Sequence, residues 1–249
     1  MAFSDTTRIG TAGWSIASDA TQAFPSAGTG LERYSAVFSC AEINSSFHRP
    51  HRTSTWEKWR ESVPTGFRFS VKVPKTISHE ARLVGAEKQM EAFLSEAGLL
   101  REKLAVLLVQ LPPSLELDPE VAGAFFRDFR AASLARVTVE PRHASWFGVE
   151  GDALLREVGV SRVGADPARL PEAALPLVEN GLAYWRLHGS PVIYRSSYVD
   201  RIGDIAAALR NTEAEERWCI FDNTASTAAT ANALGLKDAL NLPSSLPLF

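Results

Sequence analysis

Short apolar segments recur along the chain at intervals of roughly thirty residues, the length of one strand–loop–helix–loop unit. The eight segments are Ile9–Trp14, Ala41–Ser46, Phe67–Val73, Leu104–Leu111, Val137–Glu140, Arg162–Asp166, Ala183–His188 and Trp218–Asp222. Apolar residues with helical spacing stand between them, in Thr53–Val63, Glu87–Glu102, Pro119–Ala132 and Gly203–Leu209. Eight such repeats predict an α/β fold, a single TIM-type (β/α) barrel in which one helix can be irregular or missing.

The chain is expected to form one domain over residues 1–249, because no linker-like or low-complexity stretch divides it. No Gly-x-Gly-x-x-Gly motif follows any of the apolar segments. Its absence disfavours an open dinucleotide-binding sheet and favours the barrel.

Polar residues alternate with apolar ones near the carboxyl ends of the predicted strands. Because side chains in a strand alternate between faces, Thr138, Glu140 and Arg142 share one face of the fifth segment. If all such faces point inward, one mouth collects Glu42, Asn44, Lys72, Gln110, Glu140, Arg142, Asp166, Arg186 and His188. So many charged groups cannot be buried without pairing, water or a ligand. The pattern therefore predicts a site at the carboxyl ends of the strands.

Composition narrows the choice of partners and compartment. The net charge of −3 gives no general attraction to nucleic acid or to an anionic membrane, so neither is an expected partner. The two cysteines, Cys40 and Cys219, cannot build a disulfide framework. The first residues lack the pattern of a signal peptide, and no apolar run approaches the ~20 residues of a membrane span. We expect a cytoplasmic protein.

Seven groups of short motifs, spread over most of the chain, carry a family resemblance. They are Ile9–Trp14; Glu42–Phe47; Phe69–Pro74 with Ile77–His79; Gln110–Pro113; Glu140–His143 with Ser145–Trp146; Arg186–Gly189; and Phe221–Thr224. With these motifs the chain resembles the domain of unknown function 72 family, whose known folds are variations on a TIM barrel. His48 and Asp222 depart from the tyrosine and asparagine that are common there. The resemblance implies a fold and a set of site positions, and it implies no reaction.

Paired carboxylates at the predicted mouth suggest acid/base chemistry. Glu42 and Glu140 would rise from opposite strands and, with His188, are the candidate catalytic residues. A glycosidase is one interpretation of such a pair. The nearby cations Arg142, Lys72 and Arg186 would instead keep both carboxylates ionised, which favours a substrate that carries negative charge. The plainer alternative for the fifth segment is a structural Glu140–Arg142 ion pair.

The candidate substrate-binding residues surround that mouth. They are Asn44, Lys72, Gln110, Arg142, His143, Asp166, Arg186, Asn223, Trp14 and Tyr198. Trp14 follows the first strand, and Tyr198 belongs to a long segment, 189–200, that is either a lid over the mouth or simply a mobile loop. Asn223 and Thr224 precede an alanine-rich stretch, where they could cap a helix whose amides face an anion.

No cofactor and no metal ion are expected at the mouth. Glu140, His143, Asp166, His188 and Asp222 are suitable metal ligands, but their spacing is not that of a compact histidine motif, and three nearby cations would repel a divalent ion. Two function classes stay open. One is a metal-independent enzyme acting on a small anionic or sugar-like molecule, with a divalent-metal-dependent hydrolase or isomerase as its variant; the other is a non-catalytic metabolite-binding module.

Overall fold

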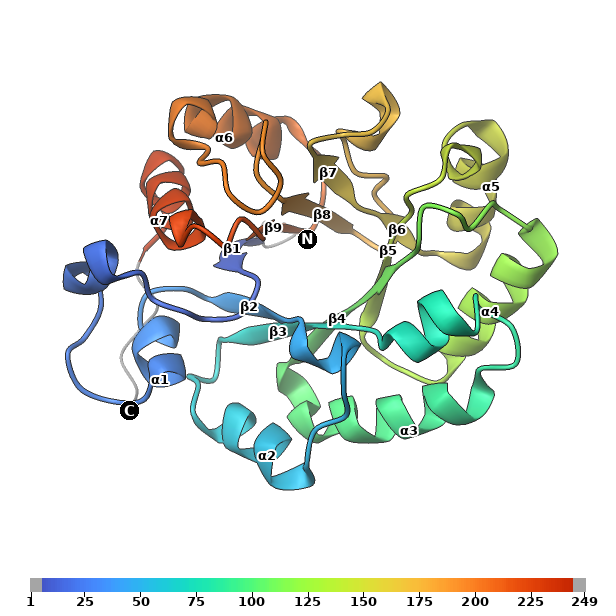
Figure 1. Cartoon of the computed structure of the whole chain (residues 1–249), viewed down its shortest axis with the longest axis horizontal. Helices are drawn as coiled ribbons and strands as arrows, with labels where there is room; N and C mark the ends of the chain where they lie inside the picture. The colour runs from blue at the N-terminus through green and yellow to red at the C-terminus, as the bar shows by residue number, and fades with distance from the viewer. Residues whose placement is uncertain (1–5, 244–249) are drawn as a thin grey trace.

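Parallel strands form the centre of the computed structural model, which describes residues 6–243, and helices surround them (Figure 1). The strands are β1 (Thr6–Thr11), β2 (Cys40–Ile43), β3 (Arg68–Lys72), β4 (Leu104–Gln110), β5 (Arg136–Glu140), β6 (Ser161–Arg162), β7 (Gly164–Asp166), β8 (Leu182–Leu187) and β9 (Glu216–Phe221). Each of the eight apolar segments of the sequence overlaps one of these strands, except that the sixth overlaps both β6 and β7.

The strands make two parallel sheets that meet at both edges. One sheet has the order β1-β9-β8-β7 and the other β2-β3-β4-β5-β6. At the first junction Ala12 forms a parallel bridge with Glu42, and the backbone N–H of Gly13 donates to the Glu42 carbonyl at 2.8 Å. At the second, Val163 lies between β6 and β7 and donates its N–H to the Val139 carbonyl at 2.9 Å. The predicted TIM-barrel-like α/β fold is confirmed.

The helices lie around the outside of the strands (Figure 1). They are α1 (Gly30–Ser35), α2 (Thr53–Glu61), α3 (Glu87–Ala97), α4 (Pro119–Ala131), α5 (Val149–Val158), α6 (Ile202–Asn211) and α7 (Ala228–Ala239). Short 3₁₀ or π segments occupy Ser18–Ala23, Ser45–Phe47, Thr76–Glu80, Gly98–Lys103, Ala144–Trp146, Pro171–Ala173 and Val199–Arg201. None of the helices between residues 6 and 243 combines the length and the apolar character needed to cross a membrane.

Helix α4 shows how the sequence builds the outer layer. Asp118 caps it by accepting hydrogen bonds from the backbone N–H groups of Glu120 and Val121 at 3.0 and 3.1 Å. Pro119 occupies the first turn, where a missing N–H costs nothing. The helix buries Phe126 and other phenylalanines in the main core, and each such ring contributes about 1.5–3 kcal/mol by leaving water.

A second, smaller core fills the interior of the strand assembly. It consists of Cys40, Val106, Leu108, Val163, Leu182, Tyr184, Trp218 and Ile220. Cys40 is two residues before Glu42, Tyr184 is two before Arg186, and Leu108 is two before Gln110. Because strand side chains alternate, these polar residues continue the same inward faces toward the carboxyl ends. The predicted inward phase therefore holds for β2, β4 and β8.

Candidate functional site

A single arginine, Arg186 on β8, joins three carboxylates at the carboxyl ends of the strands. Its guanidinium donates to both oxygens of Glu42, at 2.7 and 3.1 Å. It also donates to Glu140 Oε2 at 2.6 Å and to Asp222 Oδ2 at 3.0 Å. The guanidinium has a rigid fork of five donors, so one side chain can hold carboxylates that come from β2, β5 and the end of β9.

Glu42 is completely buried and has its oxygens occupied. Besides the contacts with Arg186, Glu42 Oε2 accepts a hydrogen bond from the Tyr184 hydroxyl at 2.8 Å. That hydroxyl also lies 2.7 Å from the Ser70 hydroxyl. Burial and the Glu42 charge raise the pKa of Tyr184 well above its usual value, so the phenol keeps its proton. Glu42 thus lies beneath the mouth, and both of its carboxylate oxygens are bonded to Arg186 or Tyr184.

Glu140 is the most heavily bonded carboxylate of the mouth. Its Oε1 accepts from Arg142 Nε and Nη2 at 3.0 and 2.6 Å and lies 2.9 Å from His188 Nε2. Burial by itself raises the pKa of Glu140, but Arg186, His188 and Arg142 together hold it well below its usual value. Glu140 is therefore ionised at neutral pH.

His188 bridges two carboxylates through its two ring nitrogens. Nε2 faces Glu140, and Nδ1 lies 3.0 Å from Asp222 Oδ2. Burial opposes a charge on the ring, yet Glu140 and Asp222 raise the pKa of His188 above its usual value. The two carboxylates thus favour the imidazolium form of His188, in which both ring nitrogens act as donors.

The side-chain amine of Lys72, the last residue of β3, has no hydrogen bond or ion pair within the described residues, although the side chain is buried; the Lys72 backbone carbonyl accepts a hydrogen bond from the Ser46 hydroxyl at 2.7 Å. Its Nζ lies 4.1 Å from the centre of the Phe47 ring. Burial and the neighbouring Arg186 lower the pKa of Lys72 to about 8, against the opposing effect of Glu42, Glu140 and Asp222.

The charges of the mouth do not cancel. Three carboxylates, from Glu42, Glu140 and Asp222, face three permanent or largely charged cations, from Arg186, Arg142 and Lys72. Protonated His188 adds one more positive charge. The mouth therefore carries excess positive charge when Lys72 and His188 are both protonated, and such a surplus in a buried place favours an anion.

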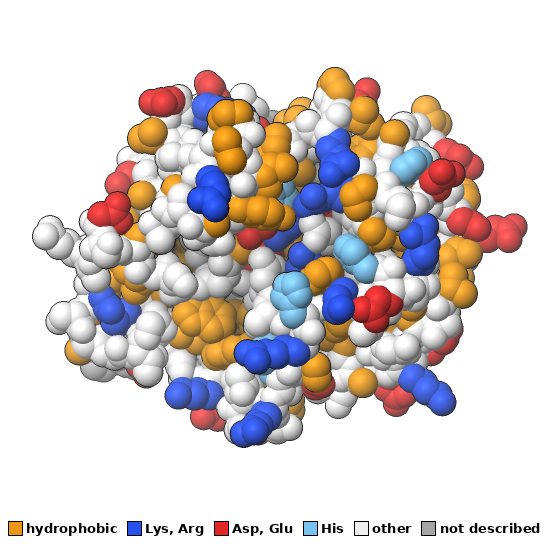
Figure 2. Space-filling view, in the orientation of Figure 1, with side chains coloured by type: hydrophobic (Ala, Val, Ile, Leu, Met, Phe, Trp, Pro, Cys, Tyr) orange, Lys and Arg blue, Asp and Glu red, His pale blue; other side chains and the backbone are white. Residues whose placement is uncertain are grey.

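A cavity of about 110 Å³ opens beside these groups. Its lining includes Glu140, Arg142, His188, Phe147, Ala165, Arg169 and Ile193. In the space-filling view, basic and histidine side chains gather around the hollow in the middle of the face (Figure 2). The cavity could accommodate a molecule of a few heavy atoms whose anionic group contacts Arg142 and His188.

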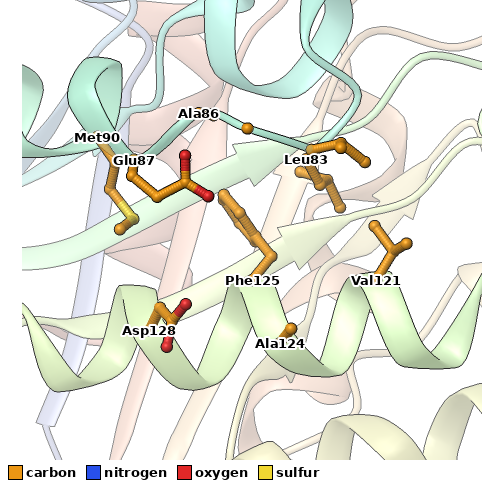
Figure 3. Close-up of a pocket in the computed structure, with 10 residues that line it drawn as sticks. Leu83, Ala86, Glu87, Met90, Val121, Ala124, Phe125 and Asp128 are labelled. Atoms are coloured by element: carbon orange, nitrogen blue, oxygen red, sulfur yellow. The ribbon is translucent and has the colours of Figure 1, made fainter.

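A larger apolar hollow of about 210 Å³ lies away from this mouth, beside α3 and α4 (Figure 3). It is lined by Leu83, Val84, Gly85, Ala86, Glu87, Met90, Val121, Ala124, Phe125 and Asp128. Its lining contains two carboxylates and no cation or histidine. The smaller cavity at the mouth is the better candidate because titratable groups with shifted pKa values converge there.

Two further predicted residues lie within the mouth. Asn44 Nδ2 is 3.4 Å from Asp222 Oδ1, a long contact, and Asn44 Oδ1 is buried without a hydrogen-bond partner. Gln110 ends β4 beside Glu140, its partner in the strand register. Together with Glu42, Lys72, Arg142, Arg186 and His188, these residues make the cluster that the alternation predicts.

Asp166 lies outside that cluster, and its predicted inward orientation is wrong. Its carboxylate accepts hydrogen bonds from Arg201 at 3.0 and 2.7 Å and from the Tyr198 hydroxyl at 2.8 Å. The inward positions of this segment are Val163, in the inner core, and Ala165, beside the cavity. Asp166 has the opposite phase and faces the segment that precedes α6.

Tyr198 is a buried anchor. Its hydroxyl accepts from the Gly189 N–H at 2.8 Å and contacts Asp166. Both ends of the segment 189–200 are thereby tied to the end of β7. Asn223 adds a second tie, since its Nδ2 donates to the Ser196 carbonyl at 2.9 Å and to Asn232 Oδ1 at 2.8 Å. Neither Tyr198 nor Asn223 lines the cavity at the mouth.

Three other sequence-based interpretations need correction. Asn223 does not cap the last helix, because α7 begins only after Thr227. His143, a predicted substrate-binding residue, caps the short turn that follows it: its Nδ1 accepts a hydrogen bond from the Ser145 N–H at 3.2 Å. Trp14 packs edge-on against Trp59 and Phe69, with ring centres 5.3 and 6.3 Å apart. None of the three lines the cavity at the mouth.

Sequence reasoning did not single out three contributors to the site. Tyr184 donates a hydrogen bond to Glu42, and Ser70 bonds to the Tyr184 hydroxyl; their place on the inward faces of β8 and β3 was the available signal. Arg169 lines the cavity from an exposed loop after β7, and no local pattern marks it.

Within residues 6–243, no group of three or more histidine, cysteine, aspartate or glutamate side chains is arranged to hold a metal ion. At the mouth, Arg186 itself lies among the three carboxylates, and it donates a hydrogen bond to each of them. The donors of that cluster are thus directed at a guanidinium.

Comparison with known proteins identifies a family and relatives that this chain resembles. The model of the family described as "Protein of unknown function DUF72" matches residues 8–247. The UPF0759 protein YecE of Escherichia coli K12 is 32% identical over 153 residues, which span 59% of this chain and 56% of YecE. The match thus covers little more than half of that relative.

Two solved structures resemble the whole chain. A DUF72 family protein of Enterococcus faecalis V583 superposes with a TM-score of 0.79 at 24% identity, covering 96% of each chain. Another, from Thermotoga maritima MSB8, gives a TM-score of 0.75 at 23% identity and covers 95% of this chain and 99% of its own. At these identities the likeness concerns the fold.

Proposed function

The chain belongs to the DUF72 family of proteins of unknown function, and on that premise we propose that it is a metal-independent enzyme for a small anionic substrate. The substrate would be a phosphorylated, carboxylated or sugar-like acid that binds at the carboxyl ends of the strands. Its anionic group would contact Arg142 and His188, and the reaction would proceed by acid/base chemistry.

The observation that carries the proposal is the surplus of positive charge beside a cavity. Arg186 occupies the oxygens of Glu42 and one oxygen of Glu140. Arg142 and protonated His188 both bond to the other oxygen of Glu140, Oε1, and both line the cavity. An anion entering the cavity would receive charge-assisted hydrogen bonds and would offset buried positive charge.

The contacts favour His188 over Glu140 as the group that moves a proton. Glu140 is held ionised by three cationic groups, so it is a poor proton donor and a weak base. The neighbouring carboxylates Glu140 and Asp222 raise the pKa of His188, which favours its protonated form. In the proposal a substrate oxygen takes the place of Glu140 at His188 Nε2 and receives its proton, while Asp222 keeps the ring oriented through Nδ1.

The position of Arg186 supports a mechanism without a metal. It supplies the positive charge among the three carboxylates that a divalent ion would otherwise supply. A glycosidase that uses Glu42 and Glu140 as its acid and nucleophile is disfavoured, because both are bonded to the same guanidinium and Glu42 is completely buried.

A second candidate is a binding module without catalysis. One observation favours it: both ring nitrogens of His188 are already engaged by carboxylates, so binding of an anion leaves no free base among the residues that line the cavity. In that case the same cations would hold a metabolite without turnover.

Calorimetric binding of glycerol 3-phosphate and malate, with glycerol as the uncharged control, tests the proposal. We expect the two anions to bind and glycerol not to bind. Arg142→Gln should weaken anion binding by about tenfold or more, because a charge-assisted hydrogen bond is lost. Arg127→Gln, on an exposed surface of α4, is the matched control and should bind normally. Equal binding of glycerol, or unchanged affinity in Arg142→Gln, would refute the proposal.

Turnover then separates the enzyme from the binding module. Conversion of a bound anion is followed by NMR with wild type and with His188→Asn. An enzyme should lose turnover in His188→Asn while affinity falls only a few-fold. Binding without any conversion by the wild type, across a panel of phosphorylated and carboxylated metabolites, would favour the binding module.

A further inference from the structure

Lys72 combines burial with an unused hydrogen-bonding capacity. It is 9% exposed and ends β3, two residues after Ser70 on the inward face. An ammonium has three donors, yet among residues 6–243 Lys72 Nζ has neither a hydrogen-bond acceptor nor an ion-pair partner. Its Nζ lies over the face of the Phe47 ring, 4.1 Å from the ring centre, in a cation–π contact.

The carboxylates of the mouth do not satisfy Lys72, because other donors hold them. Glu42 is bonded to Arg186 and Tyr184, and Glu140 to Arg186, Arg142 and His188. The amine is therefore desolvated and lies near a second cation, Arg186. These are the two circumstances that make a lysine amine nucleophilic in proteins.

Another buried lysine shows what an ordinary structural lysine looks like in this fold. Lys103 is 4% exposed, and its Nζ donates to the carbonyls of Val63 and Pro64. These two carbonyls accept hydrogen bonds from the Lys103 amine and give it a structural role. Lys72 has no such acceptors, although the two lysines are buried to a similar degree.

We propose that the Lys72 amine binds its substrate covalently, as an imine with a small aldehyde or ketone that carries a carboxylate or phosphate. The inference rests on the proposed function and makes it more specific: Arg142 would hold the anionic group and His188 Nε2 would face the carbonyl oxygen. Lys72, which interacts electrostatically with Glu140 and Asp222 and lies outside the lining of the cavity, would attack the carbonyl carbon. The lowered pKa of Lys72, about 8, agrees with this role, since a fraction of the amine is neutral near neutral pH.

The step is balanced without an oxidant or reductant. The amine lone pair forms a C–N bond, and the carbonyl π electrons move to oxygen, which takes a proton from the His188 imidazolium. The carbinolamine nitrogen then returns one proton to His188, His188 passes that proton to the hydroxyl, and the hydroxyl leaves as water to give a protonated imine. The C=N bond that results draws electrons from the adjacent carbon and makes its protons easier to remove.

Reductive trapping tests the inference on the wild-type chain. The protein is incubated with glyoxylate or glycolaldehyde phosphate, reduced with sodium cyanoborohydride and mapped by peptide mass spectrometry. We expect the adduct at Lys72 to exceed that at each of the other five lysines by at least tenfold. Uncharged glycolaldehyde should label Lys72 at least tenfold less, and added inorganic phosphate should suppress labelling by the anionic probes.

Two variants make the result specific. Lys72→Arg keeps the positive charge and should lose the adduct, whereas Lys103→Arg should keep it. Labelling spread evenly over the lysines, an undiminished yield in Lys72→Arg, or equal labelling by uncharged glycolaldehyde would overturn the inference. Binding of glycerol 3-phosphate without any trapped adduct would refute the covalent role and leave the proposed function standing. Absence of anion binding would refute the proposed function itself.

Discussion

At the amino ends of the strands, Glu216 pairs with Arg8 and Arg136, and these side chains keep 17%, 13% and 31% of their surface exposed. At the carboxyl ends, Arg186 pairs with Glu42 and Glu140, and none of these three side chains exceeds 1% exposure. The residue types are the same in both clusters. The access of water to them differs.

This difference in solvation separates a replaceable ion pair from one on which the fold depends. Partly exposed pairs contribute about 0–1 kcal/mol, because water and salt screen them. Buried charges have lost their hydration, so each needs its partner, and removing one partner leaves the others uncompensated. The amino end therefore tolerates change, whereas the mouth combines a high desolvation cost with surplus positive charge, which is typical of a ligand site.

The largest expected effect is on Arg186. Arg186→Leu should lower the free energy of unfolding by about 3–5 kcal/mol or more, because it leaves three carboxylates buried without their shared cation. Arg136→Leu at the amino end should cost roughly 0–1 kcal/mol. Urea denaturation monitored by circular dichroism measures both. Equal losses in the two variants would show that burial does not distinguish the clusters.

Acid should act on the mouth through Glu140. Its pKa in the folded protein lies well below the usual 4.5, so ionised Glu140 stabilises the fold above that pH, and this contribution is lost as the pH falls toward the folded value. In Glu140→Gln the contribution is absent at every pH. The difference in unfolding free energy between wild type and Glu140→Gln should therefore stay constant above pH 4.5 and shrink as the pH is lowered below 4.5, and a difference that stays constant below pH 4.5 would contradict the assignment.

The buried lysines of the two ends should respond in opposite ways to truncation. Lys103→Met should cost about 1–3 kcal/mol, because it removes the side-chain donor to the Val63 carbonyl and leaves the Pro64 carbonyl with the Phe67 N–H alone. Lys72→Met should be neutral or stabilising near pH 7, since burial makes the charge of Lys72 unfavourable. Because its pKa falls from 10.5 to about 8 on folding, the wild type should also gain stability between these pH values, and Lys72→Met should not. Urea midpoints across that range decide the matter; a large loss in Lys72→Met near pH 7 would mean that the amine has a structural partner.

The smallest effect concerns the segment beside the mouth. Tyr198→Phe removes the hydroxyl that links Gly189 and Asp166, and it should cost about 1 kcal/mol and speed limited proteolysis within residues 190–197. Tyr194→Phe is the matched control on the same segment, because the Tyr194 side chain is largely exposed. Equal proteolysis rates for wild type and Tyr198→Phe would show that other contacts hold the segment.

Much of this arrangement was predictable from the alternation of polar and apolar residues. Once the strands of a barrel are recognised, alternation alone orients Glu42, Glu140 and Arg186 inward, because a side chain in a strand has only two faces to choose from. The parallel order of the strands then brings their carboxyl ends together. Contact among residues more than forty positions apart in the chain follows from these two facts.

The remaining features depend on partners that local patterns do not reveal. Arg162 and Asp166 look like the polar face of their segment, but each faces outward, Arg162 toward Asp152 of α5 and Asp166 toward Arg201. Helix α1 has only six residues, too few for a periodic signal, and depends on a capping box between Thr29 and Glu32. The three side chains that bond to Glu140 could likewise not be identified from the spacing of residues in the sequence, because that spacing does not give the distances between side chains of different strands.

The guanidinium that spans β2, β5 and β9 also limits how the opening can adapt. Because Arg186 holds carboxylates at the ends of three strands, it fixes the width of the barrel opening. Moving these strands apart would break several charged hydrogen bonds at once. Selectivity among ligands then has to reside in the rim, where Arg169 and Ile193 are exposed and can be exchanged without strain in the strands. Substitutions at those two positions should therefore retune which molecules enter while the melting temperature stays the same.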